Sequence, residues 1–386
     1  MSQLKVNTIR HTGASSDAIE LNSDGTCTAK ITNNLSNRNL VINGAMQVAQ
    51  RGTSSTSTGV QTVDRFYTSA TGLTLTTTQH DLTSSDTGPW EKGFKKSYHI
   101  QNTSVGSNNA TDIAGIRYIT EAQDIVNSGW LHTSTSSYIT FSFWVKSSLA
   151  GTYYANVRSK DSTNKVYVFP FTVAADTWLK VEKSIPGASN IVINNDNGSG
   201  LDINIYTFRG TDGTDSGFTI NSWASFNASS RTPDFAQNFN TTSNATFEIT
   251  GVQLEVSDHA TDFEFKSYND ELARCQRYYQ RWAGDHAGNY GISAGYTYSN
   301  GVNTATGLNL SQPMRATPTA ENMTDTSAYV HSQGTSAAVT SVAFTGYTLN
   351  SNWVALGLAH ADLGSANYAA TLTNASNKYI ALTAEL

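Results

Sequence analysis

Apolar and polar residues alternate with a period of two along much of this chain, in short runs separated by turn residues. In the clearest run, Tyr138–Lys146, one face carries Ile139, Phe141, Phe143 and Val145. The other face carries Tyr, Thr, Ser, Trp and Lys side chains. Alternation of this kind predicts a half-buried β-strand.

Comparable runs recur at spacings of about 8–12 residues, which is the rhythm of an antiparallel sandwich. They are TYYANVR (152–158), KVYVFPFTV (165–173), TWLKVEKSI (177–185) and LDINIYTF (201–208). We therefore predict that residues 39–262 form one β-sandwich, with a jelly roll as the expected type.

The pattern changes in residues 263–283, which we predict to be a short connecting α-helix. The strand-like run before it, TFEITGVQLEV, is interrupted at Gly251, and such a glycine often marks a bulge or a close backbone approach. Ser267 can cap a helix that has acidic residues in its first turn and arginines in its later turns. The predicted apolar stripe of this helix consists of Leu272, Cys275, Tyr279 and Trp282.

A single helix of about four turns is not stable alone in water, so its apolar stripe must pack against something. One alternative is that the stripe packs against the helix's own β domain. The other is that it packs against copies of itself around an oligomer axis. We expect the second arrangement, because a β domain precedes the helix and another follows it.

The two ends of the chain also have strand-like patterns. Residues 1–38 contain the runs LKVNTI and AIEL between turn signals, with too few apolar residues for a core of their own. We predict that this segment is an attachment segment that pairs with other chains, and the alternative is a floppy tail. Residues 284–386 contain further runs up to the final KYIALTAEL and predict a smaller C-terminal β domain. The expected fold class is therefore all-β.

Composition agrees with an all-β chain. Charged residues make up only 14% of the 386 residues, and 18 Tyr and 15 Phe stand among many Ser, Thr, Asn and Gly. Thr and aromatic residues favour strands, whereas Asn, Gly and Ser favour turns. A disordered chain would contain fewer aromatic residues.

Charge and apolar content exclude two classes of partner. The formal net charge is −6 and the pI is about 5.7, so the basic footprint of a nucleic-acid-binding protein is missing. No apolar run approaches the roughly 20 residues of a membrane span, and the N-terminus lacks the apolar core of a secretory signal. Cys27 and Cys275 lie far apart, which predicts neither a disulfide nor a Cys-based metal site. We expect synthesis in a reducing cytoplasm, without nucleic-acid binding or membrane insertion.

Several longer motifs follow one another along the chain: NLVINGAMQVAQRGT (39–53), TVDRF (62–66), ITFSFWVKSSLAGTYY (139–154), TWLKVEKSIPG (177–187), ITGVQLEVSDHATDFEFKSYNDELARCQRYYQR (249–281) and PMRATPT (313–319). In this order they resemble a widespread group of tailed-phage virion proteins, described as tail-fibre or receptor-binding proteins, particularly of phages of cyanobacteria and other marine bacteria. The resemblance covers most of the chain from residue 39 onward. The N-terminal segment resembles the virion-anchoring start of such fibres.

The resemblance implies a carbohydrate-binding-module-like jelly roll, a fibre-like homotrimer and recognition of a host surface polysaccharide or receptor. It also implies that residues 1–38 bind other tail proteins, which places the chain in the tail fibre of a virion. The expected function is therefore a trimeric tail-fibre subunit that mediates host attachment. One alternative is a structural adaptor or a capsid or tail decoration protein that contacts no receptor. Another, from a different class, is a glycan-cleaving enzyme.

The sequence contains no cluster that predicts catalysis. The loops GTDGTDSG and NNDNGSG contribute Asp212, Asp215 and Asp196, and turn formation explains each of them. Structural calcium is the alternative for such oxygen-rich loops, and related jelly rolls often carry one, although neither loop has the spacing of a calcium-binding hand. The eight histidines are scattered without ligand spacing. We expect no enzyme activity, no cofactor and no metal site.

Aromatic residues outside the obvious core alternation are the candidates for sugar contacts, because an aromatic ring can stack on the apolar face of a pyranose. In and near the sandwich loops these are Trp90, Trp130 and Trp223. In the C-terminal domain they are Tyr290, Tyr296, Tyr298 and Tyr347. The alternative is that these tryptophans are core residues, which is the more common role of tryptophan in a sandwich.

Overall fold

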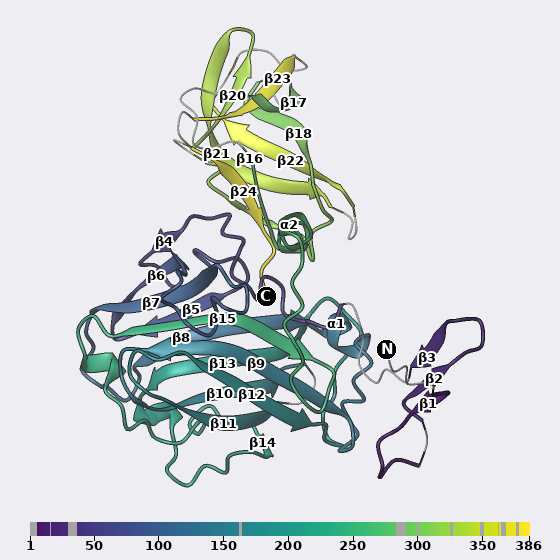
Figure 1. Ribbon diagram of the computed structural model, residues 1–386. Helices are drawn as coiled ribbons and strands as arrows, with labels where there is room; N and C mark the ends of the chain where they lie inside the picture. The colour runs from purple at the N-terminus through teal and green to yellow at the C-terminus, as the bar shows by residue number, and fades with distance from the viewer. Residues whose placement is uncertain are drawn as a thin grey trace. The chain divides into compact units, whose positions relative to one another are not determined.

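The computed structural model describes residues 6–15, 17–29, 37–161, 164–282, 291–298, 301–324, 327–347, 351–361, 363, 368–375 and 378–386. The chain divides into two compact units, Met1–Arg38 and Asn39–Leu386. The first unit is an antiparallel sheet in the order β1 (Thr8–Ile9), β2 (Ile19–Leu21) and β3 (Cys27–Ala29) (Figure 1). None of its side chains that the structure describes is buried, as its low apolar content predicts.

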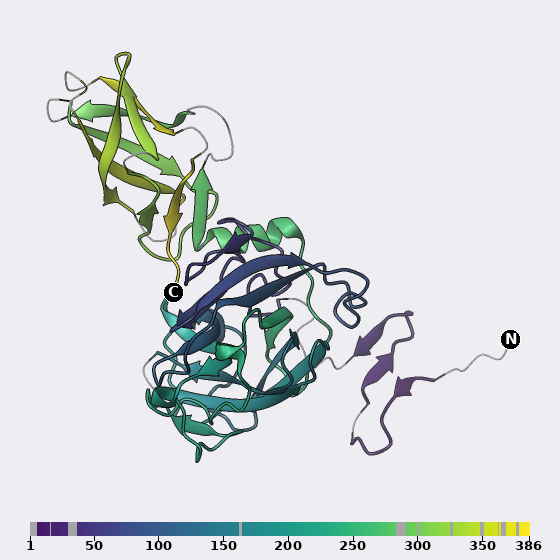
Figure 2. The same cartoon turned by 90° about the vertical axis from the view of Figure 1, so that its left-hand side faces the viewer.

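The second unit begins with a sandwich of two six-stranded antiparallel sheets (Figures 1 and 2). Sheet I has the order β14 (Trp223–Ser225), β11 (Lys165–Val173), β10 (Gly151–Ser159), β13 (Ser199–Arg209), β8 (Ile113–Glu121) and β5 (Tyr67–Thr71). Sheet II has the order β12 (Leu179–Pro186), β9 (Tyr138–Ser147), β15 (Thr246–Glu255), β7 (Lys96–Ser104), β6 (Thr74–Asp81) and β4 (Ser54–Ser55). Short helical turns connect some strands: α1 (Ala122–Val126), η1 (Thr211–Gly213) and η2 (Phe239–Thr241).

The strand order is that of a jelly roll. Numbering β7 to β13 and β15 from one to eight gives the order 1-8-3-6 in sheet II and 2-7-4-5 in sheet I. Successive strands therefore alternate between the two sheets, except that β10 and β11 are neighbours in sheet I, as in two interlocked Greek keys. The predicted fold class, an all-β chain with a jelly-roll sandwich, is confirmed.

The core lies between the two sheets and follows the predicted alternation. All four residues of the predicted apolar face of β9, Ile139 to Val145, are fully buried. Phe141 packs edge-on against Phe169 of β11 with 6.2 Å between ring centroids, and Phe143 packs against Phe171 with 5.5 Å. Because side chains alternate across a strand, the residues between these apolar ones point to the outer face of sheet II.

The predicted bulge in β15 is confirmed. The pairing of β15 with β9 shifts register between Thr250 and Gln253, and Gly251 has a φ of 61°. A Cβ atom at this position would lie 2.6 Å from the ring of Phe94. The sequence therefore needs glycine here both for the left-handed backbone and for the close approach of the ring.

The NLVINGAMQ motif forms no strand, and its polar residues fix an irregular buried segment. The side chain of Asn39 donates to the carbonyl of Val252 at 3.0 Å. The side chain of Asn43 donates to the carbonyl of Val48 at 2.9 Å. A Cβ atom on Gly44 would lie 2.0 Å from the Val252 carbonyl oxygen, so only glycine fits. The residues of the motif are therefore needed to hold the segment that leads into the sandwich in its irregular conformation.

The helix is shorter than predicted. Helix α2 spans Tyr268–Gln276, and the hydroxyl of Ser267 caps it by accepting from the N–H of Asp270 at 3.2 Å. The chain then turns into strand β16 (Tyr279–Trp282), which pairs with β24 (Ile380–Thr383). Tyr279 and Trp282 therefore do not lie on the helix, and residues 263–283 are not helical throughout. Aromatic residues favour strands, and the pairing with β24 outweighs the helical spacing.

The predicted oligomer-packing stripe is covered by its own chain. Cys275 is buried in a cluster with Ile42, Val48 and Tyr278, and Leu272 packs against that cluster. Tyr279 is also buried, and the guanidinium of Arg51 lies 3.6 Å from its ring centroid. The structure therefore favours the first of the two alternatives, in which this segment packs against its own β domain.

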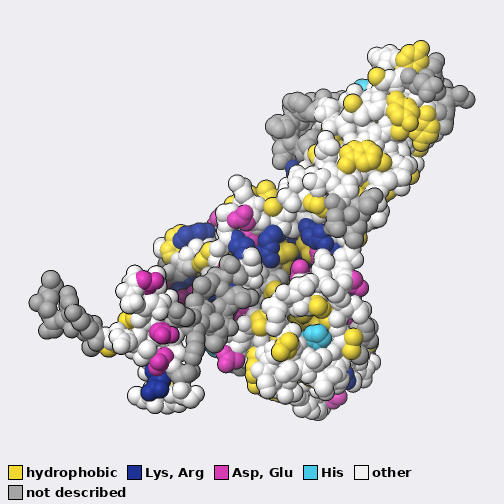
Figure 3. Space-filling model, turned by 90° about the vertical axis from the view of Figure 1, so that its right-hand side faces the viewer, with side chains coloured by type: hydrophobic (Ala, Val, Ile, Leu, Met, Phe, Trp, Pro, Cys, Tyr) yellow, Lys and Arg dark blue, Asp and Glu magenta, His cyan; other side chains and the backbone are white. Residues whose placement is uncertain are grey.

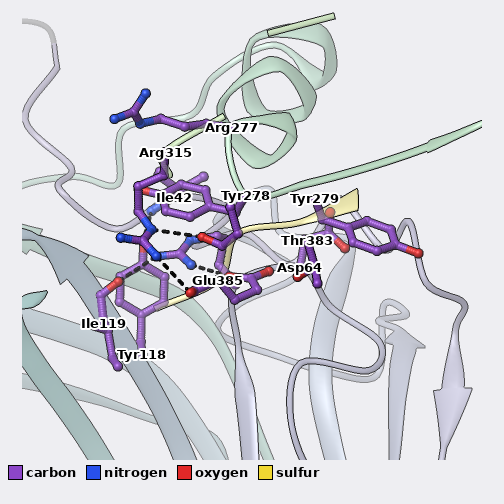
Figure 4. A network of polar contacts seen from close by, with 12 residues as sticks. Ile42, Asp64, Tyr118, Ile119, Arg277, Tyr278, Tyr279, Arg315, Thr383 and Glu385 are labelled. Carbon is purple, nitrogen blue, oxygen red and sulfur yellow. Dashed lines mark hydrogen bonds and ion pairs between the residues drawn. The ribbon is translucent and has the colours of Figure 1, made fainter. Parts of the chain in front are cut away.

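A buried polar network joins the end of α2 to the sandwich (Figure 4). The carboxylate of Glu121, at the end of β8, accepts two hydrogen bonds from Arg277 at 2.6 and 2.8 Å. Arg65 donates to the carbonyl of Ile119 at 2.6 Å, is ion-paired with Glu385, and stacks 3.4 Å from the ring centroid of Tyr278. Since a buried charge without a partner is costly, these pairs hold the segment after β24 and the segment after α2 in place.

The C-terminal part contains a closed six-stranded barrel and a small sheet. The barrel has the order β17 (Gly291–Tyr298), β18 (Asn303–Asn309), β22 (Trp353–His360), β21 (Thr335–Gly346), β20 (Ala328–Ser332) and β23 (Ala369–Asn374). Strand β24 lies between β16 and β19 (Thr319–Glu321) in the small sheet. A core that includes Val330, Val339, Leu356 and Leu358 fills this part. No helix in the described residues is long and apolar enough to span a membrane.

Candidate binding pocket

A hollow of about 270 Å³ lies on the outer face of sheet I, and we call it the sheet I pocket. Its polar floor comes from the alternation in β13, where Leu201, Ile203 and Ile205 face the core. The residues between them face outward and line the pocket. The lining residues are Tyr67, Ser69, Ile113, Arg117, Asn156, Arg158, Lys160, Asp202, Asn204, Tyr206, Arg209, Phe226 and Arg231.

The floor of the pocket is a connected polar network. Arg117 donates to both oxygens of Asp202, from Nε at 2.8 Å and from Nη2 at 2.9 Å. The side chain of Asn204 donates to Asp202 at 3.2 Å and to Asn156 at 3.1 Å. Burial alone would lower the pKa of Arg117, but its hydrogen bonds and ion pair with Asp202 raise it. Polar groups that are already held in position can bind ligand hydroxyls at little entropic cost.

Tyr67 supplies an exposed aromatic ring at one side of the pocket. It is the first residue of β5 and is 36% exposed, whereas Tyr206 on the neighbouring part of the floor is only 5% exposed. Phe226 is the third ring, and the guanidinium of Arg158 already covers it at 3.5 Å from the centroid. Tyr67 is therefore the ring with free surface on which a sugar could stack.

A second hollow, of about 230 Å³, adjoins the first, and we call it the tail pocket. Tyr67 and Arg117 line both hollows. The other walls of the tail pocket include Arg51, Arg65 and Glu385 of the buried polar network. Because Tyr67 lies between the two hollows, a ligand of more than one sugar unit could contact both.

A third hollow, of about 430 Å³, lies over sheet II and is lined by Phe94, Trp144, Phe263 and Phe265 together with two acidic and two basic residues. Its phenylalanines mainly pack on one another, with ring centroids 4.9 to 5.0 Å apart. Trp90, one of the predicted sugar contacts, packs beside this cluster, and the ammonium of Lys95 lies 3.2 Å from its ring centroid. The face of Trp90 is thus already occupied.

The other two predicted tryptophans are part of the sandwich structure. Trp130 is only 2% exposed and packs in the core, so its ring offers no free face to a ligand in this structure. Trp223 in β14 is half-buried, donates to the carbonyl of Pro186 at 2.6 Å, and packs edge-on against Tyr167. In both cases the ring fills the sandwich, which is the more common role of tryptophan in this architecture.

The predicted tyrosines of the C-terminal part have different surroundings. Tyr290 lies outside the described residues. Tyr296 is 54% exposed, and the rings of Tyr296 and Tyr298 on β17 lie 6.3 Å apart. Tyr347 packs against the core and donates to the carbonyl of Met314. Figure 3 shows apolar side chains spread over the surface of the barrel, at the upper right, with hardly any charged ones.

The aspartate-rich loops form turns, as predicted. Asp215 accepts from the N–H of Gly217 at 2.9 Å, and Asp196 accepts from the N–H of Gly198 at 2.8 Å. Both are hydrogen bonds from a backbone group to a carboxylate two residues earlier, which is the geometry of an Asx-turn. Among the described residues, no group of three or more His, Cys, Asp or Glu side chains could hold a metal ion.

None of the predicted aromatic residues lines the sheet I pocket, whereas its residues lie on elements that the sequence did predict. LDINIYTF contributes Asp202, Asn204 and Tyr206, and the TVDRF motif directly precedes Tyr67. The available signal was the polar half of the alternation in LDINIYTF. Asp202 and Asn204 face outward, yet they are only 2% and 9% exposed, and buried polar residues of this kind are the informative observation.

No protein-family model and no curated protein sequence matches the chain. Among solved structures, the enzymatically active domain of tailspike protein 4 of bacteriophage CBA120 is similar over 57% of this chain, with 12% identity and a TM-score of 0.31. That similarity spans only 21% of the tailspike chain.

Two carbohydrate-binding modules are also similar. The family 11 module of Clostridium thermocellum, solved with a mixed-linked β-1,3-1,4 tetrasaccharide, matches 53% of this chain and 96% of its own, with 12% identity and a TM-score of 0.27. The first CBM22 xylan-binding domain from Paenibacillus barcinonensis matches 54% and 94%, with 13% identity and a TM-score of 0.26.

Proposed function

We propose that this chain is a glycan-binding protein and that the sheet I pocket is its binding site. The observation that carries the proposal is the exposed ring of Tyr67 beside a hydrogen-bonded floor of Asp202, Asn204 and Asn156. A sugar presents an apolar face to an aromatic ring and hydroxyls to amides and carboxylates. A pocket with one free ring and a small number of positioned polar groups matches that chemistry.

We propose further that the protein is a subunit of a tailed-phage tail fibre, a homotrimer that attaches to the host through a surface glycan and to the tail through residues 1–38. The ordered motifs between residues 39 and 319 support this assignment through their resemblance to fibre proteins. The second candidate is an adaptor or decoration protein that touches no receptor. The NLVINGAMQ motif does not distinguish a receptor-binding fibre from an adaptor, because its asparagines stabilise the fold and would be needed in either protein.

We also propose that the protein binds glycans without cleaving them. Glycoside hydrolysis ordinarily requires two carboxyl groups on either side of the scissile bond. Asp202 is the carboxylate among the described residues that line the sheet I pocket, and both of its oxygens accept hydrogen bonds from Arg117. Release of reducing ends from the bound polysaccharide would contradict this part of the proposal.

The binding proposal is tested by measuring the affinity of the full chain for a panel of purified bacterial surface polysaccharides, with Tyr67→Ala as the site variant. We expect saturable binding that Tyr67→Ala weakens about tenfold, since a central aromatic contact can carry this share of the binding energy. Tyr268→Ala is the matched control, because Tyr268 is 52% exposed on α2, outside the residues lining the pocket. Equal binding by wild type and Tyr67→Ala would remove the pocket from the proposal. Absence of binding to every polysaccharide would favour the adaptor role.

A further inference from the structure

The sheet I pocket is basic although the chain as a whole is acidic. The formal net charge of the chain is −6. Five described lining residues are basic, namely Arg117, Arg158, Lys160, Arg209 and Arg231, and one, Asp202, is acidic. Because Arg117 is paired with Asp202, four cationic side chains are left without a carboxylate among the described lining residues. A cluster of one sign inside a hollow concentrates the electrostatic potential there.

Two of the four cations are fixed around one aromatic ring. The guanidinium of Arg158 lies 3.5 Å from the ring centroid of Phe226, and that of Arg231 lies 5.1 Å from it. Arg158 also donates to the side chain of Asn164 at 2.8 and 3.2 Å, and Arg231 donates to the carbonyl of Ala228 at 3.1 Å. These partners are uncharged, so they orient the guanidinium groups without neutralising them. A preorganised cation loses little conformational entropy when a ligand binds.

Arg209 has an unused hydrogen-bond donor. The residue is only 8% exposed, and its Nε donates to the carbonyl of Gly213 at 3.3 Å. Its Nη1 is buried and has no hydrogen-bond partner among the described residues. Gly213 makes room for the guanidinium, since a Cβ atom there would lie 1.8 Å from Nε. Buried polar groups are nearly always paired, so an unpaired donor on a pocket-lining arginine indicates a missing acceptor.

The basic side chains also repel one another. Burial lowers the pKa of Lys160, and the positive charge of Arg117 lowers it further. Burial likewise lowers the pKa of Arg209; the neighbouring Tyr206 raises it, and the charge of Arg231 lowers it again. Asp212, on the adjoining turn, acts in the opposite direction on Arg209 but more weakly than Arg231. An anionic ligand would relieve this repulsion.

We propose that the sheet I pocket selects acidic glycans, in which a sugar unit carries a carboxylate or a sulfate group. The anionic group would accept hydrogen bonds from Arg209 and from the arginine pair at Phe226, since guanidinium groups match planar or tetrahedral oxyanions. Tyr67 would stack on a sugar ring of the same chain. This inference rests on the proposed glycan-binding function and narrows it to one class of ligand.

The test compares matched pairs of polysaccharides that differ only in charge. Polygalacturonate is compared with its fully methyl-esterified form, and dextran sulfate with dextran, using the full chain. We expect at least one acidic member to bind about tenfold or more tightly than its neutral partner, and this preference to shrink as salt is raised, because screening weakens charge pairs. The carboxylate and sulfate pairs together identify which anionic group the pocket prefers.

Variants tie the preference to the pocket. The double variant Arg158→Gln/Arg231→Gln keeps polar side chains at both positions and should lose most of the preference for the acidic polysaccharide. The control Lys96→Gln/Lys378→Gln removes the same charge from residues outside the pocket and should retain the preference. Thermal unfolding of each variant checks that the sandwich is intact. If both double variants lose the same affinity, net charge explains the preference and the proposal is overturned.

The outcomes separate this inference from the function on which it rests. Equal or tighter binding of the neutral polysaccharides, still sensitive to Tyr67→Ala, would overturn acidic selectivity and leave glycan binding standing. Binding to neither kind of polysaccharide would overturn both. Polyglutamate and duplex DNA are the remaining probes. Binding of either through the arginine pair as tightly as the acidic polysaccharide would show a general polyanion site, and would also overturn the proposal.

Discussion

At the scale of single residues, the sandwich places its charged side chains in hydrogen-bonded groups on the outer faces of the sheets. Asp86 is an example over sheet II, where it is only 9% exposed. It accepts from the ammonium of Lys146 at 2.8 Å, from the indole N–H of Trp178 at 3.1 Å and from the backbone of Thr83 at 3.0 Å. Such a carboxylate is expected to contribute to stability only while it is ionised.

This arrangement predicts a specific loss of stability in acid. Burial alone would raise the pKa of Asp86, but the hydrogen bonds from Lys146, Thr83 and Trp178 outweigh burial and lower the pKa from 3.8 to about 2. A depressed pKa in the folded state stabilises the protein above the unfolded value, and this contribution is lost as the pH falls from about 4 to about 2. We expect Asp86→Asn to lower the free energy of unfolding at neutral pH by on the order of 1–2 kcal/mol.

Urea unfolding at a series of pH values measures this effect. The curve for Asp86→Asn should lie below that of wild type at neutral pH and approach it near pH 2. Asp258→Asn is the control, because the Asp258 side chain is 74% exposed and its pair with His259 is on the surface. That variant should follow the wild-type curve. A constant gap between Asp86→Asn and wild type at every pH would contradict the role assigned to ionised Asp86.

At the scale of elements, β15 shows how one residue sets the path of a strand. Its bulge lies beside the NLVINGAMQ segment, and the carbonyl of Val252 accepts from Asn39. The N–H of Val252 in turn donates to the carbonyl of Gly44 at 2.9 Å. The bulge therefore connects the central strand of sheet II to the segment by which the chain enters the sandwich.

Gly251→Ala should be destabilising for two separate reasons. The φ of 61° disfavours any residue with a Cβ atom, and the new atom would lie 2.6 Å from the ring of Phe94. We expect a loss of about 2–3 kcal/mol in the free energy of unfolding, combining backbone strain with overpacking. Gly129→Ala is the matched control, because Gly129 has a φ of 88° and a Cβ atom there would meet nothing within 4 Å. It should cost only about 1 kcal/mol. Equal losses would show that the contact with Phe94 adds nothing.

An element could be predicted from the sequence where local interactions determine it, and could not where pairing with a distant segment determines it. The alternation in Tyr138–Lys146 predicts the buried face of β9. All four of its alternate apolar side chains lie on the same side of the strand, and a shift of one residue would expose all of them. The cap at Ser267 is predictable because capping is a local interaction. The end of α2 is not, because Tyr279 leaves the helical path to pair with Thr383, more than one hundred residues away. A long-range pairing of this kind leaves no mark in the local sequence.

The candidate site was harder to predict than the fold for a related reason. Arg117, Arg158, Asp202 and Arg231 come from three strands and a loop, and only the jelly-roll order brings them together. A tryptophan offers a large ring for stacking on a sugar, yet large rings such as Trp130 contribute most when they are buried. The exposed ring of Tyr67 follows directly after a buried phenylalanine, so its position in the sequence resembles that of a core residue.

At the scale of the whole molecule, the two compact units differ in whether they contain a buried apolar core. The unit Asn39–Leu386 contains the sandwich core and the barrel core. In the unit Met1–Arg38, Val6, Ile9 and Leu21 are 39%, 52% and 42% exposed. Because the segment around α2 is covered by its own chain, the exposed apolar residues of the N-terminal strands become the stronger candidates for contacts between copies.

Deletion of residues 1–38 tests this assignment. We expect residues 39–386 to unfold within about 2 °C of the full chain, since neither buried core loses a described residue. Binding at the sheet I pocket should also be unchanged. The mass should differ: the full chain is expected to be a trimer and residues 39–386 a monomer, which light scattering after size exclusion measures directly.

A second variant separates loss of the strands from loss of their apolar contacts. In the full chain, Ile9→Ser/Leu21→Ser leaves strands β1 and β2 at their full length but removes two exposed apolar side chains. This variant should weaken the trimer in the same way as the deletion. Thr8→Ser/Glu20→Gln changes the neighbouring positions of the same strands and should leave the trimer intact. A trimeric 39–386 fragment would instead place the contacts in the larger unit. Tyr296 and Trp353, which are 54% and 48% exposed in the barrel, would then be the residues to change next.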